Sequence, residues 1–263
     1  NFAQRLVIKT IESLTGKKKL EKLYKNYSLN PQNPQAFWSD ILNEMKIKVK
    51  NKSNNELIIP KVGSLLIIAN HPFGIVDGLI LCSIVSKVRN DFKIMTHETL
   101  QFLPQLANFI LPVEFGNIDK NAKKRNIETA KSAKDQLNNG GVLIIFPSGS
   151  VSTAKSLKSG AEDDDWKLFR AKLIQQTKVD VMPIYFDGKN GVLFHLFATK
   201  IKNQTLKYSS YIHETRKKIG KDVIIYSGNI IKYIEISKFK SRIELTKYLK
   251  EVTYNLKSKS KKE

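Results

Sequence analysis

The chain has 263 residues, enough for one large α/β domain or two smaller ones with a substantial core. Its 45 Lys and Arg against 24 Asp and Glu give a formal net charge of +21, which favours polyanionic partners such as nucleic acid, anionic lipid or an acidic carrier protein. The single cysteine, Cys82, excludes a disulfide within the chain, and no apolar run reaches the roughly 18–20 residues of a membrane-spanning helix.

The first 45 residues are predicted to be helical. Residues 1–29 contain basic amphipathic stretches with an apolar stripe that begins Phe2, Leu6, Ile11, Leu14. Pro34 suits the first turn of a further short helix that carries Phe37, Ile41 and Met45. We expect residues 1–45 to form a segment that docks on an anionic membrane surface, the alternative being that its apolar stripe packs on the protein's own core.

Strands and helices alternate from residue 57 onward, after a polar loop at Lys50–Asn55. We predict strands at 65–69, 92–96, 109–113, 142–146, 179–186 and 223–227, and helices at 78–88, 121–137, around 166–173, 206–218 and 239–256. This order predicts a layered single α/β domain over residues 46–256, with a mostly parallel sheet flanked by helices. A disordered basic tail is expected at 257–263.

The stretch NHPFGIVDG at 70–78 places a histidine and an aspartate around a glycine turn after a buried strand. Parallel α/β sheets bind ligands beyond the carboxyl ends of their strands, so this turn lies where a site is expected. Pro72 keeps His71 extended, and Gly74 permits a reversal that can fold Asp77 back onto the imidazole. Such a pair suits direct transfer, with His71 as the general base and Asp77 as its orienting residue. The alternative is that Asp77 caps a helix and His71 is structural.

A second glycine turn, Phe146-Pro147-Ser148-Gly149-Ser150, follows the strand at 142–146. We expect Ser148 and Gly149 to shape a pocket of backbone N–H groups and Ser150 to offer a hydroxyl donor. This turn and Gly78 are together expected to supply the oxyanion and acceptor contacts. The acidic run at 162–165 is predicted to cap the helix that follows it, and no metal is assigned.

These motifs resemble the glycerolipid and lysophospholipid acyltransferases of the PlsC-like superfamily. That family has a His–Asp motif after a strand and an F-P-x-G motif about seventy residues later. Here the equivalents are His71 with Asp77 and Phe146-Pro147-Ser148-Gly149, and Val181-Met182-Pro183-Ile184 resembles a proline-containing family motif.

Two departures narrow the resemblance. Five residues rather than the usual four separate the histidine from the aspartate, so Val76 stands at the common aspartate position. Ser148 stands where the family commonly has the glutamate of F-P-E-G-T. Both forms are similar to the hemolysin-like branch, which implies an ornithine-type or related aminolipid acceptor rather than a glycerol phosphate. Arg125 matches the family's phosphate-binding arginine only loosely, and a solvated helix face is the alternative.

The turn and the resemblance together predict a peripheral membrane O-acyltransferase of membrane lipid biosynthesis. It is expected to move a fatty acyl chain from acyl carrier protein or coenzyme A to the hydroxyl of a single-chain lyso-lipid, with lyso-ornithine lipid or a related aminolipid favoured. The expected location is the cytoplasmic face of the inner membrane, with no cofactor and no nucleic-acid partner. Two alternatives stay open: lysophosphatidate as the acceptor, and a non-enzymatic basic nucleic-acid-binding protein, although the chain has no recognisable RNA- or DNA-binding motif.

Overall fold

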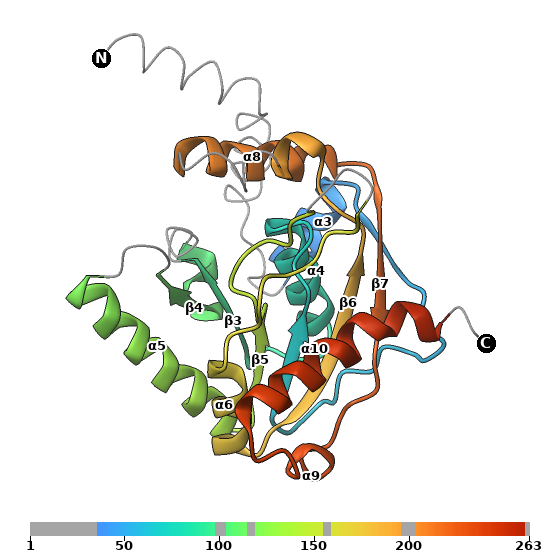
Figure 1. Cartoon of the computed structure of the whole chain (residues 1–263). Helices are drawn as coiled ribbons and strands as arrows, with labels where there is room; N and C mark the ends of the chain where they lie inside the picture. The colour runs from blue at the N-terminus through green and yellow to red at the C-terminus, as the bar shows by residue number, and fades with distance from the viewer. Residues whose placement is uncertain (1–35, 98–103, 115–118, 155–158, 196–203, 261–263) are drawn as a thin grey trace.

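The computed structural model describes residues 36–97, 104–114, 119–154, 159–195 and 204–260 (Figure 1). The amphipathic stripe predicted within residues 1–29 therefore lies outside the described residues. The helices and strands are, in chain order, α3 (Phe37–Glu44), β1 (Lys48–Asn51), β2 (Leu65–Ala69), α4 (Ile75–Ser86), β3 (Phe92–His97), the 3₁₀ helix η2 (Pro104–Phe109), β4 (Ile110–Val113), α5 (Lys120–Asn138), β5 (Val142–Ile145), α6 (Phe169–Thr177), β6 (Asp180–Asp187), α8 (Gln204–Lys217), β7 (Asp222–Ser227), α9 (Tyr233–Ile236) and α10 (Arg242–Lys259).

A seven-stranded sheet forms the centre, in the order β1-β7-β6-β2-β5-β3-β4. The five strands from β6 to β4 run parallel, whereas β7 pairs antiparallel with β6 and parallel with β1. All residues of the central strand β2 are buried, as its uninterrupted apolar sequence LLIIA requires of a strand covered on both faces. The predicted layered α/β domain with a mostly parallel sheet is confirmed.

Helices cover both faces of the sheet (Figure 1). Helices α3 and α4 pack in one apolar cluster on one face, and α5, α6 and α10 contribute to a second cluster on the other face. Phe37 and Trp38 of α3 are each 3% exposed and belong to the first cluster. Helix α3 is therefore part of the core of the α/β domain. The domain boundary predicted after residue 45 would assign this helix to a separate segment.

Three local predictions need correction. The loop predicted from Lys50 begins inside β1, an edge strand with exposed lysines, where Ile47 and Val49 alternate with Lys48 and Lys50. Helix α4 begins at Ile75 rather than at Gly78, so Asp77 lies in its first turn. The tail predicted to be disordered from 257 instead continues α10 to Lys259, where the Nζ atom of Lys257 lies 2.6 Å from Oδ1 of Asp187 at the end of β6.

The side chain of Asn70 holds the chain where it leaves β2. Its Nδ2 atom donates to the carbonyl oxygen of Phe186 at 2.9 Å, and its Oδ1 atom accepts from the Phe186 N–H at 2.6 Å. Asn70 is 1% exposed, so both backbone groups of Phe186 depend on this amide. The amide thus extends the pairing of β2 with β6 by one residue and fixes the start of the turn that contains His71.

We expect Asn70→Ala to lower the free energy of unfolding by about 1–3 kcal/mol, because it leaves a buried donor and a buried acceptor without partners. Urea denaturation followed by circular dichroism measures this. The control is Asn55→Ala, which removes an exposed hydrogen bond to Asn229 and should change the free energy by no more than about 0.5 kcal/mol. Equal losses in the two variants would contradict the role given to the Asn70 amide.

Candidate active site

The turn after β2 brings His71 and Asp77 together. The Nδ1 atom of His71 lies 3.0 Å from Oδ2 of Asp77, and the same oxygen accepts the backbone N–H of Phe73 at 2.8 Å. Gly74 makes this possible because its φ of 67° and ψ of −119° reverse the chain just before α4. An oxygen of an ionised carboxylate only accepts hydrogen bonds, so Nδ1 carries the proton and Nε2 presents its lone pair. Nε2 has no hydrogen-bond partner among the described residues.

Asp77 is fully buried, and this burial raises the pKa of its carboxyl group. The hydrogen bond from His71 and the N–H of Phe73 oppose that rise. So does the positive charge of Lys218, whose Nζ atom lies 3.5 Å from the centre of the Phe73 ring. Lys218 is itself half-buried, and desolvation lowers the pKa of its ammonium group. Lys218 is therefore a charge partner of the His–Asp pair that the sequence pattern did not indicate.

The ring of Phe146 fixes the plane of the imidazole. The two rings stack with their centres 3.9 Å apart and an angle of 20° between their planes. A Cβ atom at Gly78 would make ordinary van der Waals contacts, 3.4 Å from Cδ1 of Ile94 and 4.0 Å from Cε2 of Phe146, so the stack does not require a glycine there. Phe146 is thus a direct neighbour of the His71 ring, whereas Gly78 lies in the first turns of α4 close to Phe146.

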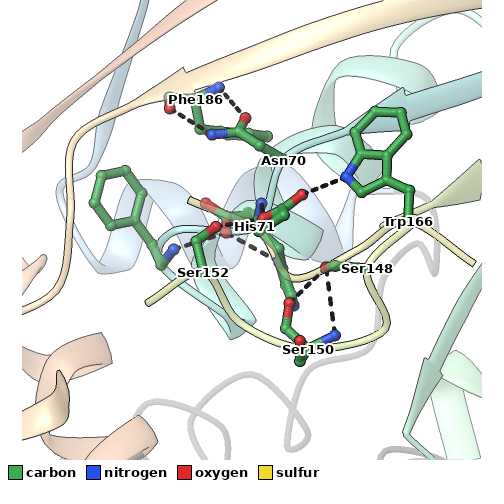
Figure 2. A network of polar contacts seen from close by, with 10 residues as sticks. Asn70, His71, Ser148, Ser150, Ser152, Trp166 and Phe186 are labelled. Atoms are coloured by element: carbon green, nitrogen blue, oxygen red, sulfur yellow. Dashed lines mark hydrogen bonds and ion pairs between the residues drawn. The ribbon is translucent and has the colours of Figure 1, made fainter. Parts of the chain in front are cut away.

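The turn that follows Phe146 is held by hydrogen bonds within itself, such as that between Ser148 and Ser150 (Figure 2), and by bonds to the segment at 164–170. The Gly149 N–H donates to the carbonyl oxygen of Phe146 at 3.1 Å, with φ of 73° at Gly149. The Ser148 hydroxyl donates to the carbonyl oxygen of Ser150 at 2.7 Å, and the Ser150 hydroxyl donates to Asp164 at 2.8 Å. The carbonyl oxygen of Pro147 accepts the N–H of Lys167. The turn is therefore rigid, and the Gly149 N–H that was predicted to face an oxyanion is already engaged in it.

Arg125 lies away from this turn. It belongs to α5, which packs on the edge strand β4, three strands from β2, and strands in a sheet are about 4.8 Å apart. Its guanidinium forms a two-pronged ion pair with Glu114, with Nη2 and Oε2 2.8 Å apart. This arginine is thus engaged by a carboxylate rather than placed beside His71.

The acidic run at 162–165 does not cap α6, whose N-cap is Leu168. Its second residue, Asp163, instead points into the protein and accepts the backbone N–H of His71 at 3.1 Å. Sequence reasoning missed this contact, since four adjacent acids gave no sign that one of them would be buried. Among the described residues, no group of three or more His, Cys, Asp or Glu is arranged to hold a metal ion.

The fold and this site define an α/β enzyme with a His–Asp pair for proton transfer at the carboxyl edge of a parallel sheet. A family model described as Acyltransferase matches residues 46–187, more than half of the chain, and contains both glycine turns. The chain belongs to this family and is an acyltransferase of the PlsC-like superfamily.

Comparison with individual proteins agrees with the family. The chain is 27% identical over 221 residues to a lyso-glycine lipid O-acyltransferase of Bacteroides thetaiotaomicron, covering 81% of this chain and 76% of the relative. It is 25% identical over 221 residues to a lyso-glycine lipid O-acyltransferase of Phocaeicola vulgatus, covering 81% and 74%. The crystal structure of PlsC, a 1-acyl-sn-glycerophosphate acyltransferase from Thermotoga maritima, aligns with a TM-score of 0.50 and 16% identity over 99% of this chain and 96% of that one. The last comparison supports the fold alone.

We expect Asp77→Asn to lower kcat/KM at least about a hundredfold and His71→Ala by roughly 10²–10⁴, because the first disturbs the orientation of the imidazole and the second removes the base. The matched control is Val76→Ala, at the common aspartate position of the family. Val76 is fully buried in the core, so this variant should lose on the order of 2 kcal/mol of stability and yet keep activity within a few-fold. Thermal melts and initial rates of acyl transfer measure the two effects. Similar activity losses in Val76→Ala and Asp77→Asn would show that the turn serves only folding.

Lys218→Met should move the acid limb of the kcat/KM profile to higher pH, by roughly half a unit to one unit. The direction of the shift follows from the charge, because removing a cation near Asp77 makes protonation of the coupled His–Asp pair easier. The proposed chemistry requires an unprotonated Nε2 atom and an ionised Asp77, so activity should be lost at a higher pH as the solution is acidified. The control is Lys221→Met, an exposed lysine one turn further on, which should leave the profile in place. An unchanged or downward-shifted limb in Lys218→Met would refute the electrostatic role of Lys218.

Proposed function

We propose that this acyltransferase moves a fatty acyl chain from a thioester of acyl carrier protein or coenzyme A to the hydroxyl of a lyso-aminolipid at a membrane surface, with lyso-glycine lipid as its first-choice acceptor. The observation that carries the chemistry is the His71–Asp77 pair, whose Nε2 atom has no protein partner among the described residues. A base that is oriented but not engaged by a serine or cysteine suits a transfer directly between two substrates.

The reaction follows from the assigned tautomer. Nε2 of His71 accepts the proton of the acceptor hydroxyl while the hydroxyl oxygen attacks the thioester carbonyl carbon. The resulting tetrahedral oxyanion collapses, the C–S bond breaks and the thiolate leaves. The imidazolium then returns the proton to the thiolate, so that the products are an ester and a free thiol. Asp77 stabilises the imidazolium in between, and Phe146 keeps its ring in plane.

Three observations favour an aminolipid over a phosphate-bearing acceptor. Both relatives named above are described as lyso-glycine lipid O-acyltransferases and match most of the chain. In addition, Arg125, the residue that loosely matched a phosphate-binding arginine, is held by Glu114. Ser148, at the position of the family's glutamate, turns its hydroxyl back onto the carbonyl oxygen of Ser150. Lyso-ornithine lipid, which the sequence pattern favoured, stays a second acceptor to be compared.

The net charge of +21 supports attraction to anionic lipid, and no helix in the described part of the chain is long and apolar enough to cross a bilayer. A lyso-lipid acceptor lies in the bilayer, so we place the enzyme at the membrane surface, on the cytoplasmic face of the inner membrane. The acidic surface of an acyl carrier protein and the phosphates of coenzyme A are both suited to the same positive field.

The acceptor is tested with purified protein, an acyl thioester of either carrier and three acceptors: lyso-glycine lipid, lyso-ornithine lipid and lysophosphatidate. Product formation is followed by mass spectrometry, with His71→Ala as the blank. We expect kcat/KM for lyso-glycine lipid to exceed that for lysophosphatidate by about tenfold or more, the discrimination of one well-placed recognition contact. A preference of that size for lysophosphatidate would replace the proposed acceptor with the alternative one.

A further inference from the structure

A second buried carboxylate lies beside His71. Asp163 is 5% exposed, and its Oδ1 atom accepts the backbone N–H of His71 at 3.1 Å and the hydroxyl of Ser152 at 2.5 Å. Its Oδ2 atom accepts Nε1–H of Trp166 at 2.8 Å. Figure 2 shows the polar network to which His71, Ser152 and Trp166 belong. The carbonyl oxygen of His71 in turn accepts the N–H of Ser152 at 2.8 Å, so the backbone N–H and carbonyl of His71 are bonded to Asp163 and Ser152, respectively.

The contacts of Asp163 fit its ionised form. All three groups bonded to its carboxylate are donors, and a proton on either oxygen would compete with one of them. Burial raises the pKa of Asp163, while the bonds from Ser152, Trp166 and the His71 backbone, and the charge of His71, lower it. Among the described residues its side chain forms no ion pair with a lysine or arginine.

The other titratable groups nearby do not neutralise this charge. The Nζ atom of Lys250 donates to the backbone carbonyl oxygens of Asp163 and Asp164, not to the carboxylate. Tyr254 accepts the Asp163 N–H, and burial raises the pKa of its phenol and that of Tyr185, so both are neutral. Glu162 is exposed. The imidazole of His71 is therefore the group that can complete the charge balance of Asp163, as it does for Asp77.

We propose that Asp163 is a positioning residue for acyl transfer: it fixes the backbone of His71 and its negative charge stabilises the imidazolium that forms when Nε2 accepts the hydroxyl proton. A purely structural bond to the His71 N–H could be made by a neutral amide or a carbonyl oxygen without the cost of burying a charge. The charge itself is needed only when the imidazole becomes positive. This inference rests on the proposed role of His71 as the base, and it requires no contact between Asp163 and substrate.

The central experiment needs no substrate. The imidazole signals of His71 are titrated by NMR in the parental protein and in Asp163→Asn, and are assigned by their loss in His71→Gln. Removing a buried negative charge should move the His71 titration to lower pH by about one unit. The control is Asp165→Asn, which removes the same charge from an exposed neighbour two residues away and should leave the titration where it is.

A second variant keeps the carboxylate and so tests the sign. Ser152→Ala removes one donor from Asp163, which leaves more of its negative charge to act on the imidazole, so His71 should titrate at the same or slightly higher pH. Thermal melts show which variants are folded. If Asp163→Asn does not fold, a titration of Ser152→Ala that moves to lower pH still overturns the proposal. An unmoved titration in folded Asp163→Asn overturns it as well.

Kinetics separate this proposal from the proposed function. Asp163→Asn should lower kcat by about tenfold with KM unchanged within about twofold, and the acid limb of the pH profile should follow the NMR titration. A uniform loss of kcat at every pH would indicate a structural role only. If the parental protein acylates none of the three acceptors, the proposed function fails, whereas the NMR titration still decides the role of Asp163.

Discussion

The burial of one carboxylate, that of Asp77, determines how the rest of the site is arranged. A carboxylate without exposed surface has to be met by donors or cations, or it becomes protonated and stops orienting the imidazole. Its partners come from separate parts of the chain: the Phe73 N–H from the turn, the His71 ring from the end of β2, and the Lys218 charge from the segment after α8. The contacts that orient the His71 ring therefore come from the turn and α4, and the segment after α8 adds a positive charge that favours ionised Asp77.

The sequence predicted the parts of this arrangement that are local. The strand at 65–69 agrees with β2 because a strand buried on both faces is continuously apolar, and the His71–Asp77 contact spans only six residues around a glycine turn. Contacts between distant segments could not be predicted in this way. Asp163 lies 92 residues from His71 in the chain, and nothing in a run of four acids marks the one that turns inward. The edge strand β1 was missed although Ile47 and Val49 alternate with lysines, because β1 itself is four residues long and contains one apolar residue, Val49.

The charge at the site has the opposite sign to the charge of the molecule. The chain as a whole carries +21, yet the two carboxylates nearest to His71 are buried and negative. The proposed function would use both features: exposed lysines would attract anionic lipid and the acyl carrier, and buried carboxylates would stabilise the imidazolium. Exposed charges are screened by salt over about 10 Å at 0.1 M, whereas buried ones are screened much less. Under the proposed function, salt should thus weaken attraction to anionic lipid more than it weakens proton transfer.

Buried charges have different roles at the amino ends and at the carboxyl ends of the sheet's strands. At the amino edge, the buried guanidinium of Arg89 donates to the carbonyl oxygens of Gly63 and Gly140 at 2.6 Å each and forms an ion pair with Asp91, residues that precede β2, β5 and β3. Arginine stays charged at every pH that the fold tolerates, so this connection between three strands does not vary with proton concentration. At the carboxyl ends of the strands, the buried groups are carboxylates around a histidine, whose charge changes during the transfer in the mechanism that we propose. The amino ends of the strands, away from the site, are consequently held by the permanent charge of Arg89. The titratable groups around His71 lie at the carboxyl ends, so a change in their protonation does not alter the contacts of Arg89.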